Sequence, residues 1–325
     1  MQKRQSVITA MSYSLGDQEY SVEESSERGL LISTVEVLRE AGFAKHRMAA
    51  PGQSAYDLAK RAVSGLGGTE KLKDVDAIVY ATCIPHNANL GDADRFRETR
   101  DVKFLMDYAV SHLQADFGMH KAIAFGLTQQ ACTGLLGGLR LAKMLIDTEP
   151  SFKKVLCLTS DRFPEGALYE QAFNLICDGA AATLVEADGE GFVIESGHQL
   201  TNGAMAQAND DETVGHFFNY TSRLFKESLA RIGLGVADLR WIVPQNTNSK
   251  AWLILSRLLG FPFESVALHT LGTVGHMISG DNVVNLLSLA RSGQIREGER
   301  LMLMMAGYGL NWQSIILRKQ GDFRE

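Results

Sequence analysis

Two short segments of the chain carry residue types that could act together as a nucleophile and a base. QQACTGLLGGL places Cys132 in a turn of small residues, and GTVGHMISGDN places His276 five residues before Asp281. A cysteine thiolate can attack the carbonyl carbon of a thioester, and a histidine can remove a proton from a hydroxyl or an amine near neutral pH. A carboxylate beside the imidazole would fix its tautomer. The chemistry in question is therefore acyl transfer through a covalent acyl-cysteine.

Cys132 precedes an apolar, helix-like pattern. Free backbone N–H groups at a helix N-terminus favour thiolate, so this position predicts a lowered thiol pKa, and the same groups could hold an oxyanion. The alternative is that Cys132 is a small buried hydrophobe, as many cysteines are. We expect Cys83, Cys157 and Cys177 to be core residues, because each lies in or beside an apolar strand pattern. No cysteine spacing suggests a disulfide framework or a metal site.

The His276 segment also has a second interpretation. Asp281 stands directly before an apolar helical pattern, where an aspartate commonly caps the first turn. His276 would then be an ordinary loop histidine. His269, at the end of an apolar strand pattern, is a less favoured substitute base.

The elements that must position these residues occur twice in the chain. Residues 58–80 and 229–244 each give an amphipathic helix, a glycine turn and a strand. Short strands at 122–125 and 266–268 follow, and each is succeeded by a small-residue loop, an apolar helix and a fully apolar strand, at 155–158 and 301–304. Apolar strands that alternate with helices indicate an α/β fold with a sheet covered on both faces.

We therefore expect two similar β/α halves, residues 1–187 and 188–325, that meet near the segment ADGEG. Cys132 and His276 take nearly equivalent positions at the mouths of the two matching helices. Packing of the halves about a pseudo-twofold axis would bring these residues together.

Composition narrows the class of protein. The 325 residues carry a net charge of −6 with no run of lysine or arginine, so charge gives no support for nucleic-acid or membrane binding. The first apolar stretch is short and broken by polar residues, so we expect it to be neither a signal peptide nor a membrane span. A cytoplasmic protein is expected.

Three ordered motifs resemble those of the thiolase-fold condensing enzymes, most closely the 3-oxoacyl-acyl-carrier-protein synthase III group. ACTG matches the ACSG-like turn of the nucleophile, Cys177-Asp178-Gly179-Ala180 matches a GDGA turn, and AGYGLNW, residues 306–312, is similar to FGGGxTWG. The resemblance implies a thiolase-like fold of duplicated halves in αβαβα layers. It also implies that Cys132 carries the acyl group and that the backbone amides of Cys132 and Tyr308 form the oxyanion hole.

The chain departs from this family at two catalytic positions. Gln245 stands where condensing members keep the histidine of a PHQAN-like segment, and His276 stands where they keep the asparagine of a GNTSA-like loop. A neutral amide cannot act as a base, although Gln245 could still donate a hydrogen bond as polar support. The His-x4-Asp pattern of His276 and Asp281 is similar to a branch of the family that transfers acyl groups to hydroxyls or amines in natural-product pathways.

The resemblance also implies the substrates. The acyl donor would be a phosphopantetheine thioester of an acyl carrier protein or of coenzyme A, the acceptor a small molecule, and no cofactor or metal would be bound. A homodimer is expected, with residues 85–104 near its interface. Two other functions stay open: a carbon–carbon condensing enzyme, and a non-catalytic partner subunit of a heterodimeric synthase. The sequence leaves the acyl chain and the acceptor unidentified.

Overall fold

The structure is a computed structural model that describes residues 4–172, 174–207, 210–308 and 310–323. Its strands are β1 Ser6–Leu15, β2 Gln18–Ser21, β3 Lys45–Met48, β4 Ala77–Ala81, β5 Ile123–Leu127, β6 Lys154–Asp161, β7 Glu170–Gln171, β8 Asn174–Leu175, β9 Gly179–Ala187, β10 Gly191–Thr201, β11 Trp241–Val243, β12 Arg300–Gly307 and β13 Asn311–Gln320. Its α-helices are α1 Val22–Glu27, α2 Val35–Glu40, α3 Ala55–Ser64, α4 Thr69–Leu72, α5 Ala93–Thr99, α6 Ala109–Asp116, α7 Gly134–Thr148, α8 Asp210–Ala230, α9 Ser249–Leu259, α10 Leu271–Val274 and α11 Asp281–Arg291. Short 3₁₀ turns include η1 Pro85–Ala88, η2 Val102–Leu105, η3 Ala131–Thr133 and η7 Ile278–Gly280.

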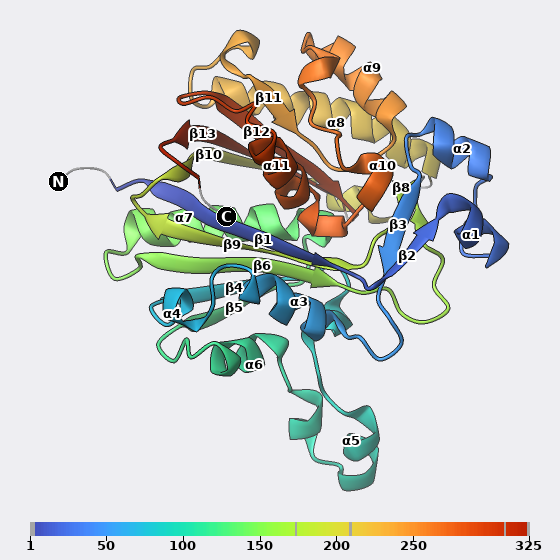
Figure 1. Cartoon of the computed structure of the whole chain (residues 1–325), viewed down its shortest axis with the longest axis vertical. Coiled ribbons are helices and arrows are strands. Elements are labelled where there is room, and N and C mark those ends of the chain that lie inside the picture. The colour runs from blue at the N-terminus through green and yellow to red at the C-terminus, as the bar shows by residue number, and fades with distance from the viewer. Residues whose placement is uncertain (1–3, 173, 208–209, 309, 324–325) are drawn as a thin grey trace.

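One mixed sheet runs through the molecule. Among the described residues, nine strands pair in the order β11-β12-β13-β10-β1-β9-β6-β4-β5 (Figure 1). The pairing repeats on the two sides of its centre: β4 is parallel to β6 and β6 antiparallel to β9, while β11 is parallel to β12 and β12 antiparallel to β13. The same order of elements thus occurs twice. The division at residue 188 stays a prediction, because the sheet joins both parts through β1 and β10.

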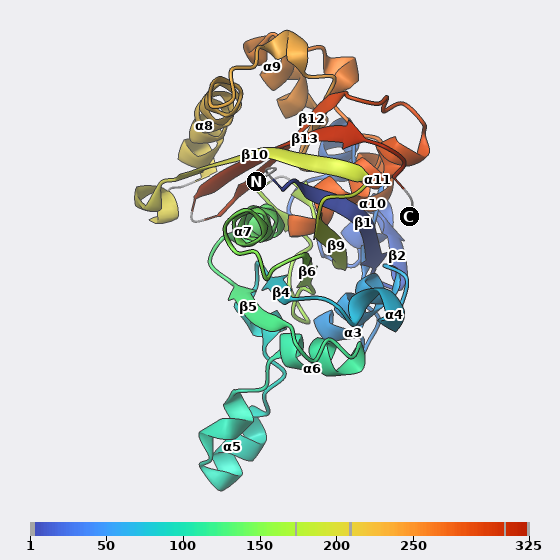
Figure 2. The ribbon, with the colours of Figure 1, turned by 90° about the vertical axis from the view of Figure 1, so that its left-hand side faces the viewer.

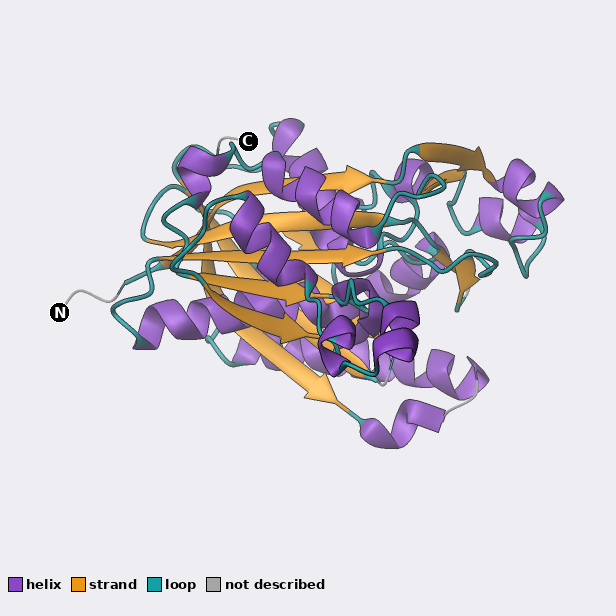
Figure 3. Ribbon diagram, turned by 90° about the horizontal axis from the view of Figure 1, so that it is seen from below, coloured by secondary structure: helices purple, strands orange, loops and turns teal. Residues whose placement is uncertain are grey.

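Helices form three layers around the strands. In the central layer, α7 contacts β4, β6 and β13, and α11 contacts β1, β9 and β12, so both helices touch strands of both halves (Figure 2). On one outer side α3 covers β1, β6 and β9, and on the other α8 covers β10 and β13. Helices consequently lie on both faces of the strands (Figure 3). The expected thiolase-like αβαβα arrangement is confirmed.

The apolar sequence runs explain the buried layers. All five residues of β4, AIVYA, are buried, and the seven residues after Lys154 in β6 are buried as well. Strands enclosed on both faces require apolar side chains on both, which accounts for continuous rather than alternating hydrophobicity. The strand predicted over 266–268 is wrong in extent, because only Val266 makes a bridge, to Ile242. The segment lies between the 3₁₀ turn at Phe263–Ser265 and helix α10, which begins at Leu271, and this leaves little length for a strand.

A polar arm leaves the body after β4. Residues 85–105 contain η1, α5 and η2, and α5 stands away from the remainder of the molecule (Figures 1 and 2). Helix α5 has no buried residue in the described structure. At the adjoining edge of the sheet, β5 is largely exposed. The arm and this edge are therefore open surfaces of the single chain.

A short segment between β8 and β9 holds the backbone of His276. The His276 N–H donates to the Leu175 carbonyl at 2.7 Å, and the His276 carbonyl accepts from the N–H of Cys177 at 2.9 Å. Gly275, the residue before it, has a φ of +78°, and a Cβ there would lie 2.7 Å from the Leu175 carbonyl oxygen. Only glycine allows both this backbone conformation and this close approach.

We expect Gly275→Ala to lower the free energy of unfolding by about 2–4 kcal/mol, because it combines a left-handed backbone with a steric clash. Gly260→Ala is the matched control: Gly260 has a φ of +64°, but its added Cβ would meet nothing within 4 Å. That control should cost only about 1 kcal/mol. Equilibrium denaturation measures both, and equal losses would contradict the role given to the Leu175 contact.

Candidate active site

Cys132 lies in the turn η3 that connects β5 to α7. Ala131 before it has a φ of +46°, and its carbonyl accepts a hydrogen bond of 3.0 Å from the hydroxyl of Ser279. Ser279 belongs to η7, the turn directly before α11. The entrances of the two central helices are thus joined by a hydrogen bond between segments almost 150 residues apart.

The Cys132 turn is braced from its other side. Gln313 of β13 donates its side-chain N–H groups to Gln130 Oε1 at 2.8 Å and to Thr133 Oγ1 at 3.0 Å. A Cβ at Gly137 would lie only 1.8 Å from Gln130 Oε1, and a Cβ at Gly307 would lie 2.8 Å from the Cys132 nitrogen. The glycines after and opposite the cysteine therefore make room for the turn and for the end of β12.

His276 and Asp281 form a buried pair. His276 Nδ1 lies 2.5 Å from Asp281 Oδ2, and the two side chains are 3% and 0% exposed. A carboxylate accepts only, so Nδ1 must carry the proton that it donates to Asp281. The lone pair of neutral His276 is consequently on Nε2. This is the arrangement of an imidazole prepared to act as a base.

Two backbone amides complete the surroundings of the Asp281 carboxylate. The Asn246 N–H donates to Oδ2 at 2.8 Å, and the Met277 N–H donates to Oδ1 at 2.6 Å. Asp281 is the first residue of α11, whose N-cap is Gly280, and the described structure shows no side-chain hydrogen bond at that cap. The carboxylate thus faces the histidine loop, and helix capping does not explain its position.

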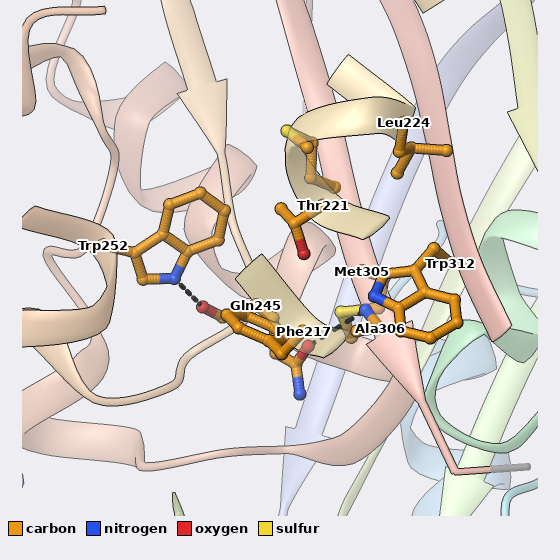
Figure 4. Close-up of a pocket in the computed structure, with 9 residues that line it drawn as sticks. Phe217, Thr221, Leu224, Gln245, Trp252, Met305, Ala306 and Trp312 are labelled. Carbon is orange, nitrogen blue, oxygen red and sulfur yellow. Dashed lines mark hydrogen bonds between the residues drawn. The ribbon is translucent and has the colours of Figure 1, made fainter. Parts of the chain in front are cut away.

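Gln245 lies next to the imidazole. Its Oε1 accepts from the Ala306 N–H at 3.0 Å, and its backbone carbonyl accepts from the indole N–H of Trp252 at 3.0 Å (Figure 4). With Oε1 engaged in this way, its amide nitrogen faces His276 Nε2 at 3.4 Å. Gln245 therefore presents N–H donors to the space beside the base.

These side chains share one cavity of about 660 Å³. Its lining includes Cys132, His276, Gln245 and Tyr308. Aromatic and aliphatic side chains from α8, α9 and β13 make up much of the remaining wall, among them Phe217, Phe218, Ile254 and Trp312. The size is within the range of small-molecule sites, and the wall suits an apolar acyl chain. Both candidate groups, nucleophile and base, can thus reach one substrate.

The Cys132 thiol is shielded from water. Interaction with the neighbouring Cys83 thiol and burial raise its pKa well above the ordinary value, and the charges of Asp161 and Asp281 act in the same direction. This is opposite to the lowering expected from the helix N-terminus, because desolvation and nearby negative charge disfavour the thiolate. Cys132 therefore rests as a neutral thiol and needs a base when it attacks.

Cys83 differs from the expectation that it is a core residue. It is half-buried and lines the cavity, whereas Cys157 and Cys177 are fully buried as expected. Its backbone N–H donates to both carboxylate oxygens of Asp161, at 3.0 and 3.1 Å. Burial raises the pKa of Asp161 to about 6, although hydrogen bonds from Thr82, Cys83 and Ile84 oppose the shift.

Sequence reasoning missed several parts of this site. Asn246 supplies an amide to Asp281, and its side-chain N–H groups donate to Thr270 Oγ1 and to the Gly275 carbonyl. Its neighbour Gln245 was identified because the segment resembles the PHQAN-like motif of the condensing enzymes. That resemblance was the signal in the sequence that pointed to this loop. Lys250 lines the cavity as well, and it pairs with Glu40 at 2.6 Å. His269, the substitute base, is exposed.

The described residues contain no group of three or more His, Cys, Asp or Glu side chains placed to hold a metal ion. None of their helices has the length and apolar character needed to cross a membrane.

Comparison with known families gives two matches. Residues 128–203 match the family model of 3-oxoacyl-[acyl-carrier-protein (ACP)] synthase III, and residues 229–319 match the model of its C-terminal part. Together they cover just over half of the chain, and each includes one of the two segments on which the site is built.

Individual relatives are similar to this chain over nearly its whole length. The beta-ketoacyl-[acyl-carrier-protein] synthase III of Rhodobacter capsulatus is 27% identical, over 91% of this chain and 94% of its own. The structure of 3-oxoacyl-(acyl carrier protein) synthase III, FabH, from Pseudomonas aeruginosa PAO1 is similar with a TM-score of 0.79 at 22% identity, covering 98% of this chain and 99% of that one. The structure of ChlB3, described as "Aceyltransferase", has a TM-score of 0.82 at 17% identity with coverage of 98% and 99%. These structural similarities concern the fold.

The raised pKa of Asp161 predicts a pH dependence of stability. Between pH 3.8, the ordinary value, and about 6, folded Asp161 retains a proton that the unfolded chain has lost. Its contribution to stability is therefore fully present below pH 3.8 and decreases as the pH rises through 6. Relative to wild type, Asp161→Asn should gain about 1.4 kcal/mol in free energy of unfolding per pH unit across this interval. Denaturant titrations at pH 4, 5, 6 and 7 measure the difference, and parallel pH curves would contradict the assignment.

Proposed function

Because this chain belongs to the 3-oxoacyl-[acyl-carrier-protein] synthase III family, we propose that it uses the acyl-cysteine chemistry of that family for a distinct second step. It would take an acyl group from a thioester onto Cys132 and transfer that group to a hydroxyl or an amine. The observation that carries this proposal is the buried pair of His276 and Asp281, which leaves the imidazole Nε2 unprotonated, with only the long 3.4 Å hydrogen bond from Gln245 on it among the described residues, in the cavity of Cys132. Biosynthesis of secondary metabolites is the proposed setting.

In the first step the Cys132 sulfur attacks the thioester carbonyl carbon. His276 takes the thiol proton, which is required because the pKa of Cys132 is raised. The carbonyl oxygen becomes an oxyanion, which the backbone amides of Cys132 and Tyr308 would stabilise. The carbon–sulfur bond to phosphopantetheine then breaks, and the departing thiolate receives the proton from His276. The products are acyl-Cys132 and free phosphopantetheine thiol.

In the second step the acceptor enters beside His276. The imidazole removes the proton of its hydroxyl or amine as the oxygen or nitrogen attacks the acyl carbon. The carbon–sulfur bond to Cys132 breaks, and the thiolate regains the proton from the imidazolium. Asp281 stabilises that imidazolium at both steps, since its carboxylate is 2.5 Å from Nδ1.

Carbon–carbon condensation is the second candidate, because the named relatives are beta-ketoacyl synthases. Gln245 supports it in one respect, since its N–H groups could donate to the oxygen of a forming enolate. A decarboxylating enzyme would release carbon dioxide from a malonyl thioester once Cys132 is acylated. Carbon dioxide release with no ester or amide product would favour this candidate over acyl transfer to a hydroxyl or an amine.

The proposal includes an acyl carrier protein or coenzyme A as donor and a homodimer as the active form. The β5 edge of the sheet is exposed, with Ile123 53% accessible, and Val102, Met106 and Tyr108 on or beside the arm are exposed as well. Apolar side chains together with an unpaired sheet edge are suited to contact a second copy.

Variants of Cys132 and His276 test the nucleophile and the base of these steps. We expect incubation with acyl-CoA to increase the mass of the wild-type chain by one acyl group, and Cys132→Ala to abolish that increase. His276→Ala should slow transfer from acyl-Cys132 to the acceptor by about 10²- to 10⁴-fold, because it removes the general base. Intact-protein mass spectrometry with single-turnover kinetics measures both steps. Full transfer activity in either variant would contradict the proposal.

Asp281→Asn tests the orienting role and should also slow transfer. An amide N–H placed against Nδ1 cannot accept a hydrogen bond from it and favours the other tautomer of His276. Asp178→Asn is the matched control. Asp178 is equally buried, but it accepts from the Ala49 and Phe163 amides and the Tyr169 hydroxyl. Equal losses in the two variants would mean that Asp281 acts only through stability.

A further inference from the structure

A small annex opens beside the catalytic cavity. It has a volume of about 10 Å³ and lies among α8, β12 and β13, with Thr221, Trp312, Gln245 and Ala306 in its wall (Figure 4). That volume is about what one water-sized group requires. Gln245, Ala306 and Trp312 line the large cavity too, as does Phe217. The annex therefore borders the space in which Cys132 and His276 act.

Two polar groups in the annex wall have no hydrogen-bond partner within the described part of the chain. They are the hydroxyl of Thr221, 4% exposed, and the indole N–H of Trp312, 2% exposed. In Figure 4 the Thr221 oxygen and the Trp312 nitrogen both point into the space above Gln245. A buried polar group left unpaired is costly, so two such groups that face one space indicate a site for a polar atom.

Neighbouring residues of the same kinds show that pairing was possible. Ser228, further along α8, donates its hydroxyl to the Leu224 carbonyl at 2.5 Å. Thr221 makes no such bond to its own helix in the described structure. Trp252 donates its indole N–H to the Gln245 carbonyl at 3.0 Å. The annex is distinguished because an unpaired hydroxyl and an unpaired indole N–H line the same small cavity.

The annex is also held rigidly. The Trp312 ring stacks on Tyr220 with centroids 4.3 Å apart and an angle of 15° between the planes. The Tyr220 hydroxyl in turn accepts from the Asn202 side chain at 2.9 Å. The stack fixes the indole plane, so the direction of its N–H is fixed as well. A donor with a fixed direction suits selective recognition.

We propose that the annex binds one oxygen atom of the substrate, a hydroxyl or a carbonyl, between Trp312 Nε1 and Thr221 Oγ1. A carbonyl oxygen would accept from both groups, and a hydroxyl would accept from the indole and exchange a hydrogen bond with Thr221. The site then selects an oxygen-bearing substrate over an apolar one of equal size, because the apolar one leaves both groups unpaired. This inference rests on the proposed acyl transfer through Cys132.

The oxygen could belong to the acyl group or to the acceptor, and the two half-reactions distinguish these sources. For the acyl group, the rate of Cys132 acylation is compared for 3-hydroxybutyryl-CoA, 4-hydroxybutyryl-CoA and pentanoyl-CoA, which have equal numbers of non-hydrogen atoms. For the acceptor, single-turnover transfer from acyl-Cys132 is compared for 1,3-propanediol and 1-butanol, which are matched in the same way. Wild type should prefer a hydroxybutyryl-CoA to pentanoyl-CoA, or 1,3-propanediol to 1-butanol.

Thr221→Val and Trp312→Phe should each reduce that preference about tenfold, because each removes one hydrogen bond to a buried oxygen. Thr221→Ser keeps the hydroxyl and should retain it. Matched controls are Thr159→Val and Trp241→Phe: both residues are buried with an unpaired hydroxyl or indole N–H among the described residues, and neither is in the wall of either cavity. These controls should leave the preference unchanged.

A loss confined to acylation assigns the oxygen to the acyl group, and a loss confined to transfer assigns it to the acceptor. No preference in wild type, or a preference unaltered by both annex variants, overturns the proposal and leaves the annex as a place for water. Equal losses in the two controls overturn it too. Failure of wild type to acylate Cys132 with any thioester would instead reject the acyl transfer itself.

Discussion

A buried carboxylate with no exposure to water is the constraint on which the active site depends. Asp281 must be compensated within the protein, and its partners are the His276 imidazole and the amides of Asn246 and Met277. They come from the loop after β11 and from the loop before α11. The hydrogen bonds to this one carboxylate therefore position two loops. They also select the Nδ1-protonated tautomer of His276, whose Nε2 is then left on the side of the cavity. Structure and chemistry share a single set of hydrogen bonds here.

The close approach of α7 and α11 depends on small residues. Ser279 joins the two helix entrances by donating to the Ala131 carbonyl, and a Cβ on Gly134 would lie 3.6 Å from Ser279 Oγ and 3.0 Å from the Ala81 Cβ of β4. Larger side chains would separate the entrances and move the nucleophile away from the base. The central helical layer of the fold thereby becomes the place where both halves contribute to one site.

The electrostatic surroundings of Cys132, before α7, differ from those of His276, before α11. Cys132 is buried against Cys83 with Asp161 and Asp281 nearby, and these surroundings raise the pKa of its thiol and favour the protonated form. His276 has the carboxylate that a base requires. This difference explains why a histidine in the loop before α11 suits a Cys132 that does not ionise by itself, and why Gln245 is left to donate hydrogen bonds.

Much of the fold was determined by the sequence itself. The apolar runs of β4, β6 and β12 predicted enclosed strands because such segments must be covered on both faces, and the repeated order of elements placed Cys132 and His276 at equivalent helix entrances. The pairing of His276 with Asp281 could be expected from their spacing, since the four residues between them, 277–280, allow the side chain to fold back. Only the tertiary structure decided what surrounds these residues: the Asn246 amide, the Cys83 thiol, the unpaired Thr221 and Trp312. Those contacts join segments far apart in the chain, and both the thiol pKa and the shape of the annex depend on how the strands and helices pack around each group.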